Sequence, residues 1–159
     1  MDQYTRRIIG FSVCKGAMKA EDLCDMFYKI IPYTAFPKRI STDNDPLFES
    51  LLWKINLAEW GVDEIKSVPS IPWSHPFVER LIKSVRNEYL DNLLFWNGVD
   101  LEQKLKRYKE YFNTSRVHHS LEGKFPSQVA NEVQVEHADL RDYRMKSFCN
   151  GMYKVPIAA

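Results

Sequence analysis

Apolar residues recur at helical spacing in four stretches of the chain. Leu23, Phe27 and Ile30, for example, are separated by four and three positions, so a helix would place them on one face. The predicted helices cover residues 17–31, 46–60, 77–90 and 100–112. Because globular proteins bury such faces, the pattern predicts a helix-rich chain in which each helix packs one side against a core.

Three of these helices have apolar stripes that we expect to face inward. The stripes are Leu47, Leu51, Ile55 and Ala58 in the second helix, Val78, Ile82, Val85 and Tyr89 in the third, and Leu101, Leu105, Tyr108 and Phe112 in the fourth. Pro46 suits a first helical turn, where the N–H that it lacks would have no partner, and Gly61 suits a left-handed cap. Asp100 and Gln103 are spaced as a capping box.

Three shorter segments have the β-branched and apolar composition of strands. They are "RRIIGFSV" (6–13), "KRIST" (38–42) and the first half of "DEIKSVPSIP" (63–72), whose second half is a proline-rich loop; residues 147–159 are expected to be extended. The second strand delivers Asp43 at its carboxyl end. Strands that alternate with helices predict an α/β domain, in which we expect helix to exceed strand at least about twofold.

Composition narrows the class of protein but not its partner. The chain has 159 residues, 45% of them hydrophobic, which suits one soluble globular domain. No apolar run reaches the roughly 18 residues of a membrane span, and the N-terminus has no signal pattern, so we expect a cytoplasmic protein without membrane contact. The net charge of +1 favours no partner class by itself. The three cysteines lack C-x-x-C spacing, which argues against disulfides and a zinc site.

Two carboxylates are candidate metal ligands. Asp43 follows a predicted strand, and Glu79 lies early in a later helix, with 35 residues between them. Open α/β sheets bind ligands at the carboxyl ends of their strands, and Mg²⁺ prefers carboxylate oxygens. Spacing alone nevertheless favours the alternative that these residues are ordinary capping and surface acids.

The Glu79 helix also carries a basic flank. Glu79, Lys83 and Arg86 are spaced to share one helix face, and Arg80 is adjacent. One interpretation is a solvated face with an ion pair between Glu79 and Lys83. The other is that Arg80, Lys83 and Arg86 bind DNA phosphates beside a metal ion.

Four segments in the same order resemble the DDE transposases and retroviral-type integrases, and most closely the integrase cores of bacterial insertion sequences. They are "DQYTRRIIGF" (2–11), "STDNDPLFES" (41–50), "SHPFVERLIKSVRNEYLD" (74–91) and "YFNTSRVHHSLEGKFPSQVA" (111–130). The resemblance implies a ribonuclease H-like fold and DNA strand transfer that depends on Mg²⁺ or Mn²⁺. It also implies that Asp43 and Glu79 are the second and third catalytic carboxylates and metal ligands.

The chain departs from the family pattern at two places. The family's first catalytic aspartate lies in a segment before the one that starts at Asp2, and Asp2 itself matches a position without a catalytic role. We therefore expect an N-terminally truncated, inactive core that is helix-rich because the first two strands are missing. Asp45 stands where the family has glycine, which aspartate can replace because it tolerates left-handed conformations.

The resemblance suggests two parts, a partial catalytic core in residues 1–95 and a helical extension with an extended tail in residues 96–159. In the tail, Asn113, Arg116, His118 and Pro126 are expected to be structural, and the pair His118 and His119 is not expected to share a metal ion. The tryptophans Trp53, Trp60, Trp73 and Trp96 are expected to pack in the interior.

Three functions remain open on this basis. The first is a DDE polynucleotidyl transferase that takes part in DNA integration and transposition, with self-association into a homo-oligomer as an open question. The second is a non-catalytic remnant of a transposase that binds DNA or serves in assembly. The third, a metal-dependent hydrolase of small substrates, ranks last because the sequence has no pocket signature.

Overall fold

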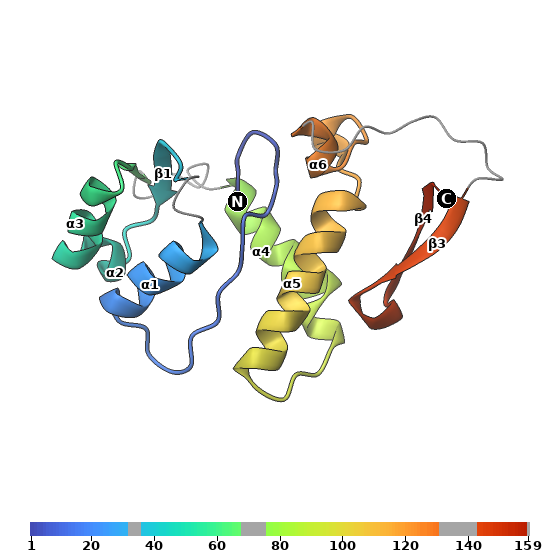
Figure 1. Cartoon of the computed structure of the whole chain (residues 1–159), viewed down its shortest axis with the longest axis horizontal. Coiled ribbons are helices and arrows are strands. Elements are labelled where there is room, and N and C mark those ends of the chain that lie inside the picture. Colours follow the sequence, from blue (N-terminus) through green and yellow to red (C-terminus); the bar gives the residue numbers. More distant parts are fainter. Residues whose placement is uncertain (32–35, 68–75, 131–142, 159) are drawn as a thin grey trace. The chain divides into compact units, whose positions relative to one another are not determined.

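The computed structural model describes residues 1–31, 36–67, 76–130 and 143–158 (Figure 1). Its contacts divide the chain into two compact units, one of residues 12–94 and one of residues 1–11 with 95–159. No helix in the described part is long and apolar enough to cross a membrane. The loop at 69–75, which includes Trp73, lies outside the described residues. The predicted division into residues 1–95 and 96–159 stays a prediction.

The unit of residues 12–94 contains one short parallel strand pair. Strand β1 pairs with β2 so that Arg39 lies opposite Asp63 and Thr42 opposite Lys66. Helices α2 and α3 connect these two strands, and α4 follows the second. The elements are α1 (Ala20–Ile30), β1 (Arg39–Thr42), α2 (Pro46–Glu49), α3 (Leu51–Glu59), β2 (Asp63–Lys66), α4 (Pro76–Glu88) and the 3-10 turn η2 (Leu90–Asn92).

The core of this unit forms around Trp53, whose side chain is fully buried. Its ring meets the ring of Phe27 edge-on at 5.3 Å between centroids and that of Phe48 at 5.5 Å. The other core residues are Cys24, Leu57 and Val62, with Leu23, Phe36, Ile40 and Trp60 packed against them. The buried face of α3 is therefore set by aromatic contacts with α1 and α2.

The inward stripe predicted for the second helix is wrong. Leu51 is 74% exposed and Ile55 53% exposed, whereas Trp53 and Leu57 are buried. The helix breaks at Ser50, whose backbone is extended and whose hydroxyl accepts a hydrogen bond from the Trp53 N–H. This break rotates α3 relative to α2, because a new cap starts a new helix with its own phase. In α4 the prediction holds for Val85 and Tyr89 but not for Ile82, which is 55% exposed.

Helix ends were predicted with mixed success. Pro46 occupies the first turn of α2, and Gly61 adopts a φ of +67° just after α3, as expected. The fourth helix begins earlier than predicted, with Asn97 as its cap. The Asp100 carboxylate reaches back instead to the backbone N–H of Trp96, at 3.0 Å. Trp96 therefore lies before the helix and is 88% exposed, so its predicted packing is wrong.

The second unit is organised around α5 (Gly98–Thr114). Its predicted apolar stripe is confirmed, because Leu105, Tyr108 and Phe112 are buried. A β-hairpin lies against this helix, and Tyr111 stacks on Tyr153 with ring centroids 4.1 Å apart. The remaining elements are η3 (His119–Leu121), α6 (Pro126–Val129), β3 (Tyr143–Phe148), η5 (Cys149–Gly151) and β4 (Tyr153–Ala158), with β3 and β4 antiparallel.

Residues 6–13 form no strand, contrary to the sequence prediction. The backbone of Ile8 is paired with a side chain instead: its N–H donates to Asn113 Oδ1 and its carbonyl accepts from Asn113 Nδ2, both at 2.9 Å. A primary amide offers both donor and acceptor, so it satisfies a buried residue as a neighbouring strand would. Ile8 is 1% exposed, and its apolar character reflects this burial rather than a strand.

Replacing Asn113 by alanine should destabilise the fold. The change leaves the buried N–H and carbonyl of Ile8 without partners, and each such group costs about 1–3 kcal/mol. We therefore expect Asn113→Ala to lower the free energy of unfolding by about 2–4 kcal/mol, measured by urea denaturation followed by circular dichroism.

Thr114→Ala is the matched control on the neighbouring residue. It removes an exposed hydrogen bond to the Glu110 carbonyl and a contact with the Ser115 hydroxyl but leaves no buried backbone group without a partner, so its effect should stay below about 0.5 kcal/mol. Equal effects of the two substitutions would show that the amide pairing does not stabilise the unit.

Candidate active site

Asp43 and Asp45 have different structural roles in the turn that follows β1. Asp45 caps α2, with its Oδ1 accepting the Leu47 N–H at 2.9 Å. The Oδ1 of Asp43 accepts the Asp45 N–H at 3.1 Å. Asp45 has a φ of −62°, so the left-handed conformation invoked for this glycine replacement is not used. Asp43 is exposed, and the structure shows no partner for its Oδ2 within the described ranges.

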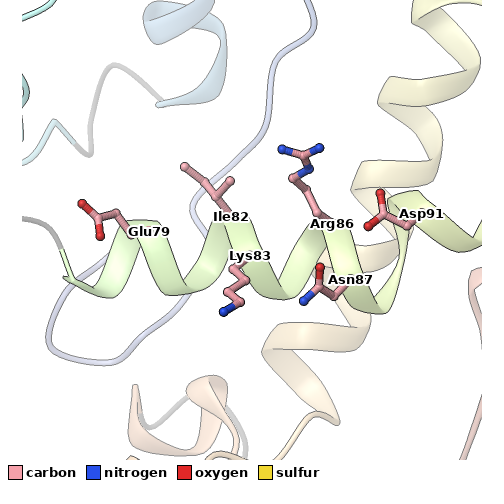
Figure 2. A pocket seen from close by; sticks show the side chains of 6 residues that line it. All are labelled: Glu79, Ile82, Lys83, Arg86, Asn87 and Asp91. Carbon is pink, nitrogen blue, oxygen red and sulfur yellow. The ribbon is translucent and has the colours of Figure 1, made fainter.

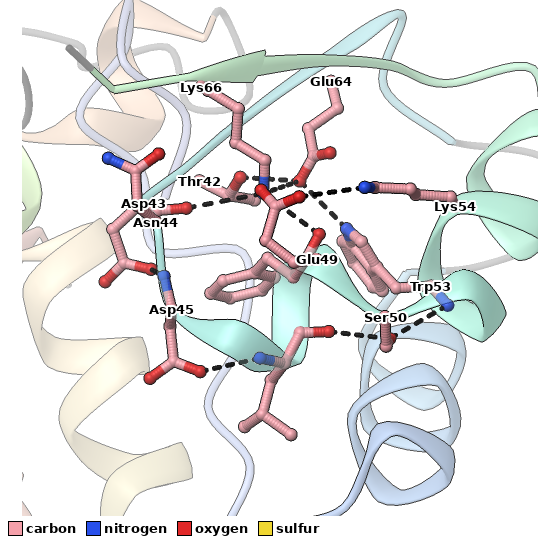
Figure 3. A network of polar contacts seen from close by, with 12 residues as sticks. Thr42, Asp43, Asn44, Asp45, Glu49, Ser50, Trp53, Lys54, Glu64 and Lys66 are labelled. Atoms are coloured by element: carbon pink, nitrogen blue, oxygen red, sulfur yellow. Dashed lines mark hydrogen bonds and ion pairs between the residues drawn. The ribbon is translucent and has the colours of Figure 1, made fainter. Parts of the chain in front are cut away.

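A single carboxylate oxygen in β2 joins the strand pair to the core (Figure 3). The Oε1 of Glu64 accepts the Thr42 hydroxyl at 2.6 Å and the Trp53 indole N–H at 3.0 Å. The ammonium of Lys66 lies 3.0 Å from the same oxygen. Glu64 therefore links the last residue of β1, the buried tryptophan and the last residue of β2.

Lys66 continues this network to the far end of the turn (Figure 3). Its Nζ lies 3.0 Å from Glu49 Oε1 and donates to the Phe48 carbonyl at 3.0 Å. The other carboxylate oxygen of Glu49 pairs with Lys54 at 2.9 Å. Lys66 also reaches the Asp43 carbonyl at 3.5 Å. The turn that carries Asp43 is thus held by one lysine at both ends.

The sequence alone did not predict that Glu64 and Lys66 belong to this site. Alternation along a strand would place Ile65 inward, yet Ile65 is 49% exposed and its two polar neighbours are partly buried. The available signal was their i, i+2 spacing, which puts both side chains on one face of a strand.

The charges of this network shift its pKa values. Burial alone would raise the pKa of Glu64, but hydrogen bonds from Thr42, Lys66 and Trp53 outweigh it and lower the pKa below its ordinary value. Burial would likewise lower the pKa of Lys66, and the two glutamates raise it instead. Both groups are therefore held in their charged forms.

Asp2 belongs to the other unit. Its carboxylate accepts the backbone N–H groups of Tyr4 and Thr5 and the Thr5 hydroxyl. Burial alone would raise the pKa of Asp2, but these hydrogen bonds lower it. Asp2 therefore closes a local turn.

The predicted basic flank lies on α4 (Figure 2). Glu79, Lys83 and Arg86 line an open pocket of about 360 Å³ together with Ile82, Asn87 and Asp91. Arg80 is exposed but does not line this pocket. Among the described residues, the structure shows no ion pair between Glu79 and Lys83, and no hydrogen-bond partner for the Glu79 side chain.

The structure places Asp43 and Glu79 on separate elements. Residues 68–75, which connect β2 to α4, lie outside the described residues, so the closeness of the two carboxylates stays a prediction. Across the described ranges, no three His, Cys, Asp or Glu side chains gather into a group that could hold a metal ion.

Known proteins are similar to this chain in sequence and in fold. Residues 61–126, which include Glu79, match the family model "Integrase core domain". Over these residues the chain is similar to integrase core domains. A chain in the cryo-EM structure of the simian T-cell lymphotropic virus intasome in complex with PP2A regulatory subunit B56 gamma has a similar fold. It has a TM-score of 0.59 at 17% identity, over 89% of this chain and 53% of that one.

A second solved structure also has a fold similar to that of this chain. The catalytic core domain of BIV integrase matches with a TM-score of 0.54 at 19% identity, over 74% of each chain. The expected ribonuclease H-like fold is therefore confirmed. So is its helix-rich character, because helix exceeds strand more than twofold among the described residues.

Two curated bacterial proteins are similar to this chain in sequence. An uncharacterized protein of insertion element IS476 from Xanthomonas euvesicatoria is 22% identical over 87% of this chain and 40% of its own length. The transposase for insertion sequence element IS904 from Lactococcus lactis is 24% identical over 79% of this chain and 51% of its own length. The chain spans about half the length of these relatives or less.

The donor chemistry of Asp43 and Glu79 suits Mg²⁺ or Mn²⁺. Asp43 and Glu79 offer exposed carboxylate oxygens, the ligands that these hard cations prefer. In the described part, Asp43 keeps one oxygen and Glu79 both oxygens without a protein partner.

Replacing Glu64 should change how stability depends on pH. The pKa of Glu64 is lower in the folded chain than its ordinary 4.5, so ionised Glu64 contributes stability above that pH. This contribution is lost as the pH falls through the folded pKa. We expect Glu64→Gln to be less stable than wild type at pH 7 and the difference to shrink at about pH 3, measured by urea denaturation.

The glutamine in this variant would keep the acceptor oxygen for Thr42 and Trp53, so the substitution isolates the charge. Asp63→Asn, at an exposed neighbouring position, is the control for loss of a carboxylate in β2. A difference between wild type and Glu64→Gln that stays constant with pH would contradict the electrostatic role of Glu64.

Proposed function

We propose that this integrase core acts on DNA in integration and transposition, with Asp43 and Glu79 as the ligands of Mg²⁺ or Mn²⁺. The observation that supports this most is the state of Glu79. Its carboxylate is exposed, has no partner in the described part of the chain, and shares a face of α4 with Lys83 and Arg86. Within the described residues, a carboxylate without an ion-pair partner beside two cations without one fits a site for a metal ion and phosphates better than a solvated face held by ion pairs.

The proposed roles follow from the chemistry of each side chain. A divalent ion bound by Asp43 and Glu79 supplies a Lewis acid for phosphoryl transfer. Lys83 and Arg86 bind phosphates of the DNA backbone, and Arg80 contributes from the adjacent side of the helix. Asp45 caps α2 and keeps its carboxylate directed to the Leu47 N–H rather than to the site.

The resemblance to transposases and integrases, together with the similar insertion-sequence proteins, supports further proposals about partners and location. The partners are DNA and further copies of the chain in a homo-oligomer, and a cytoplasmic location follows from DNA as substrate. Residues 1–95 form the partial catalytic core and residues 96–159 its extension. We further propose that these 159 residues alone bind DNA without joining it, because only two carboxylates match the family's three.

Metal binding tests the central assignment. We expect Asp43→Asn and Glu79→Gln each to weaken Mn²⁺ binding by more than about tenfold. Removing a residue that only orients a metal ligand already costs about this much, so removing the ligand itself should cost more. The reason is that each substitution removes an anionic oxygen donor and leaves a neutral amide. Mn²⁺ binding is measured by the decrease of the free-ion electron paramagnetic resonance signal.

Asp45→Asn is the matched control, because it removes a negative charge two residues from Asp43 while asparagine caps a helix as well as aspartate does. Its Mn²⁺ affinity should stay within about twofold of wild type, as expected for a screened surface charge. Equal affinity of all four proteins would contradict the metal site and leave a non-catalytic DNA-binding remnant as the better explanation.

DNA binding should depend on the cations of α4. We expect Lys83→Ala to weaken binding to a labelled duplex and to reduce the slope of log K against log salt by about 0.9, the value for one phosphate contact. In the same assay with Mn²⁺, the wild-type chain should bind the duplex without cleaving or joining it.

Lys106→Ala controls for the loss of a lysine. Lys106 is also exposed, but it pairs with Glu102 on α5 at 3.0 Å. Its slope should remain that of wild type. A joining activity that Glu79→Gln abolishes would show that the chain alone is an active transferase, and identical slopes for both lysine variants would remove α4 from the DNA interface.

A further inference from the structure

We propose that Lys66 is the positioning residue for the metal ligand Asp43, an inference that rests on the function proposed above. Asp43 lies in an exposed turn, and its side chain makes one hydrogen bond, to the Asp45 N–H. A metal ligand in an exposed turn gains affinity when its backbone is fixed before the ion arrives, since ordering it on binding costs conformational entropy.

Lys66 fixes the turn at both ends. Its ammonium reaches the carbonyl of Asp43 at 3.5 Å and that of Phe48 at 3.0 Å, so one side chain spans the segment between them. The ammonium also lies 5.6 Å from the centroid of the Phe48 ring. Because Phe48 packs on the buried Trp53, the far end of the span is anchored in the core.

The adjoining backbone supports the same arrangement. The Ser67 N–H donates to the Thr42 carbonyl at 2.9 Å, and the Asn44 amide donates to the Ser67 carbonyl at 3.2 Å. The residues on either side of Asp43 are therefore tied to the end of β2, next to Lys66. This leaves the Asp43 side chain directed to solvent from a backbone held on both flanks.

The charge of Lys66 is balanced within the network. A lone ammonium near Asp43 would oppose a divalent cation, since like charges repel. Here the ammonium lies 3.0 Å from both Glu49 and Glu64, and the second lysine of the network pairs with Glu49 at 2.9 Å. The carboxylates of Glu49 and Glu64 balance the ammonium groups of Lys54 and Lys66. Lys66 can therefore position the turn without adding a net positive charge that would repel the ion.

The decisive experiment compares two lysines of the network. Lys66→Met keeps the aliphatic stem and removes the ammonium from the turn. Lys54→Met removes an ammonium from the same Glu49 but touches neither turn carbonyl in the contacts of Figure 3. The full chain, labelled with ¹⁵N, is titrated with Mn²⁺, and paramagnetic broadening of the amides of residues 43–45 reports the affinity at this position.

We expect Lys66→Met to need about tenfold more Mn²⁺ for half-maximal broadening, as for other groups that orient a ligand. Lys54→Met should stay within about twofold of wild type, since it leaves the contacts to the turn in place. Thermal unfolding of both variants defines a temperature at which each is folded, so that the comparison reports affinity and not stability.

Asp43→Asn separates failure of this inference from failure of the proposed function. Unchanged broadening in Asp43→Asn would overturn the metal site itself. Loss of broadening in Asp43→Asn, with Lys66→Met equal to Lys54→Met, would overturn only the positioning role. If Lys66→Met does not fold, Glu49→Gln decides: it loosens the anchor of Lys66, and an affinity about threefold below Lys54→Met supports the role, whereas equality overturns it.

Discussion

The hydrogen bonds to one oxygen of Glu64 are the interaction on which the rest of the candidate site depends. Removing a carboxylate from water is unfavourable, so it persists in a partly buried position only when donors surround it. Thr42, Trp53 and Lys66 are those donors, and each belongs to a different part of the unit. Strands β1 and β2 have only four residues each, and this shared acceptor ties the ends of both strands to the core.

In the other unit, a side chain takes the place that a neighbouring strand would have. The extended backbone at Ile8 receives both of its hydrogen bonds from the Asn113 amide on α5. The hairpin of β3 and β4 covers another part of the same helix through the stacked rings of Tyr111 and Tyr153. In this unit the Asn113 side chain makes the backbone hydrogen bonds that a neighbouring strand would provide, and it is correspondingly costly to remove.

The two aspartates of the turn after β1 divide two tasks between them. Asp45 is committed to the helix, because its carboxylate caps α2 at the N-terminus, where a negative charge is favourable. Asp43 shares one oxygen with the backbone and leaves the other to solvent. A turn that only started a helix would need Asp45 and not Asp43. This division is the physical reason to treat Asp43 as a binding group and Asp45 as a structural one.

The sequence by itself indicated where most of the helices lie, the two short strands on either side of α2 and α3, and the buried stripe of α5, because these depend on local spacing. It did not determine which face of α3 is buried, since that depends on a cap at Ser50 and on aromatic partners from α1 and α2. It predicted a strand at residues 6–13, where distant side chains of α5 hydrogen-bond the backbone instead, Asn113 at Ile8 and Lys109 at Ile9. It also missed Glu64 and Lys66, because a polar residue faces inward only when donors and acceptors far away in the sequence meet it there, and tertiary structure alone decides that.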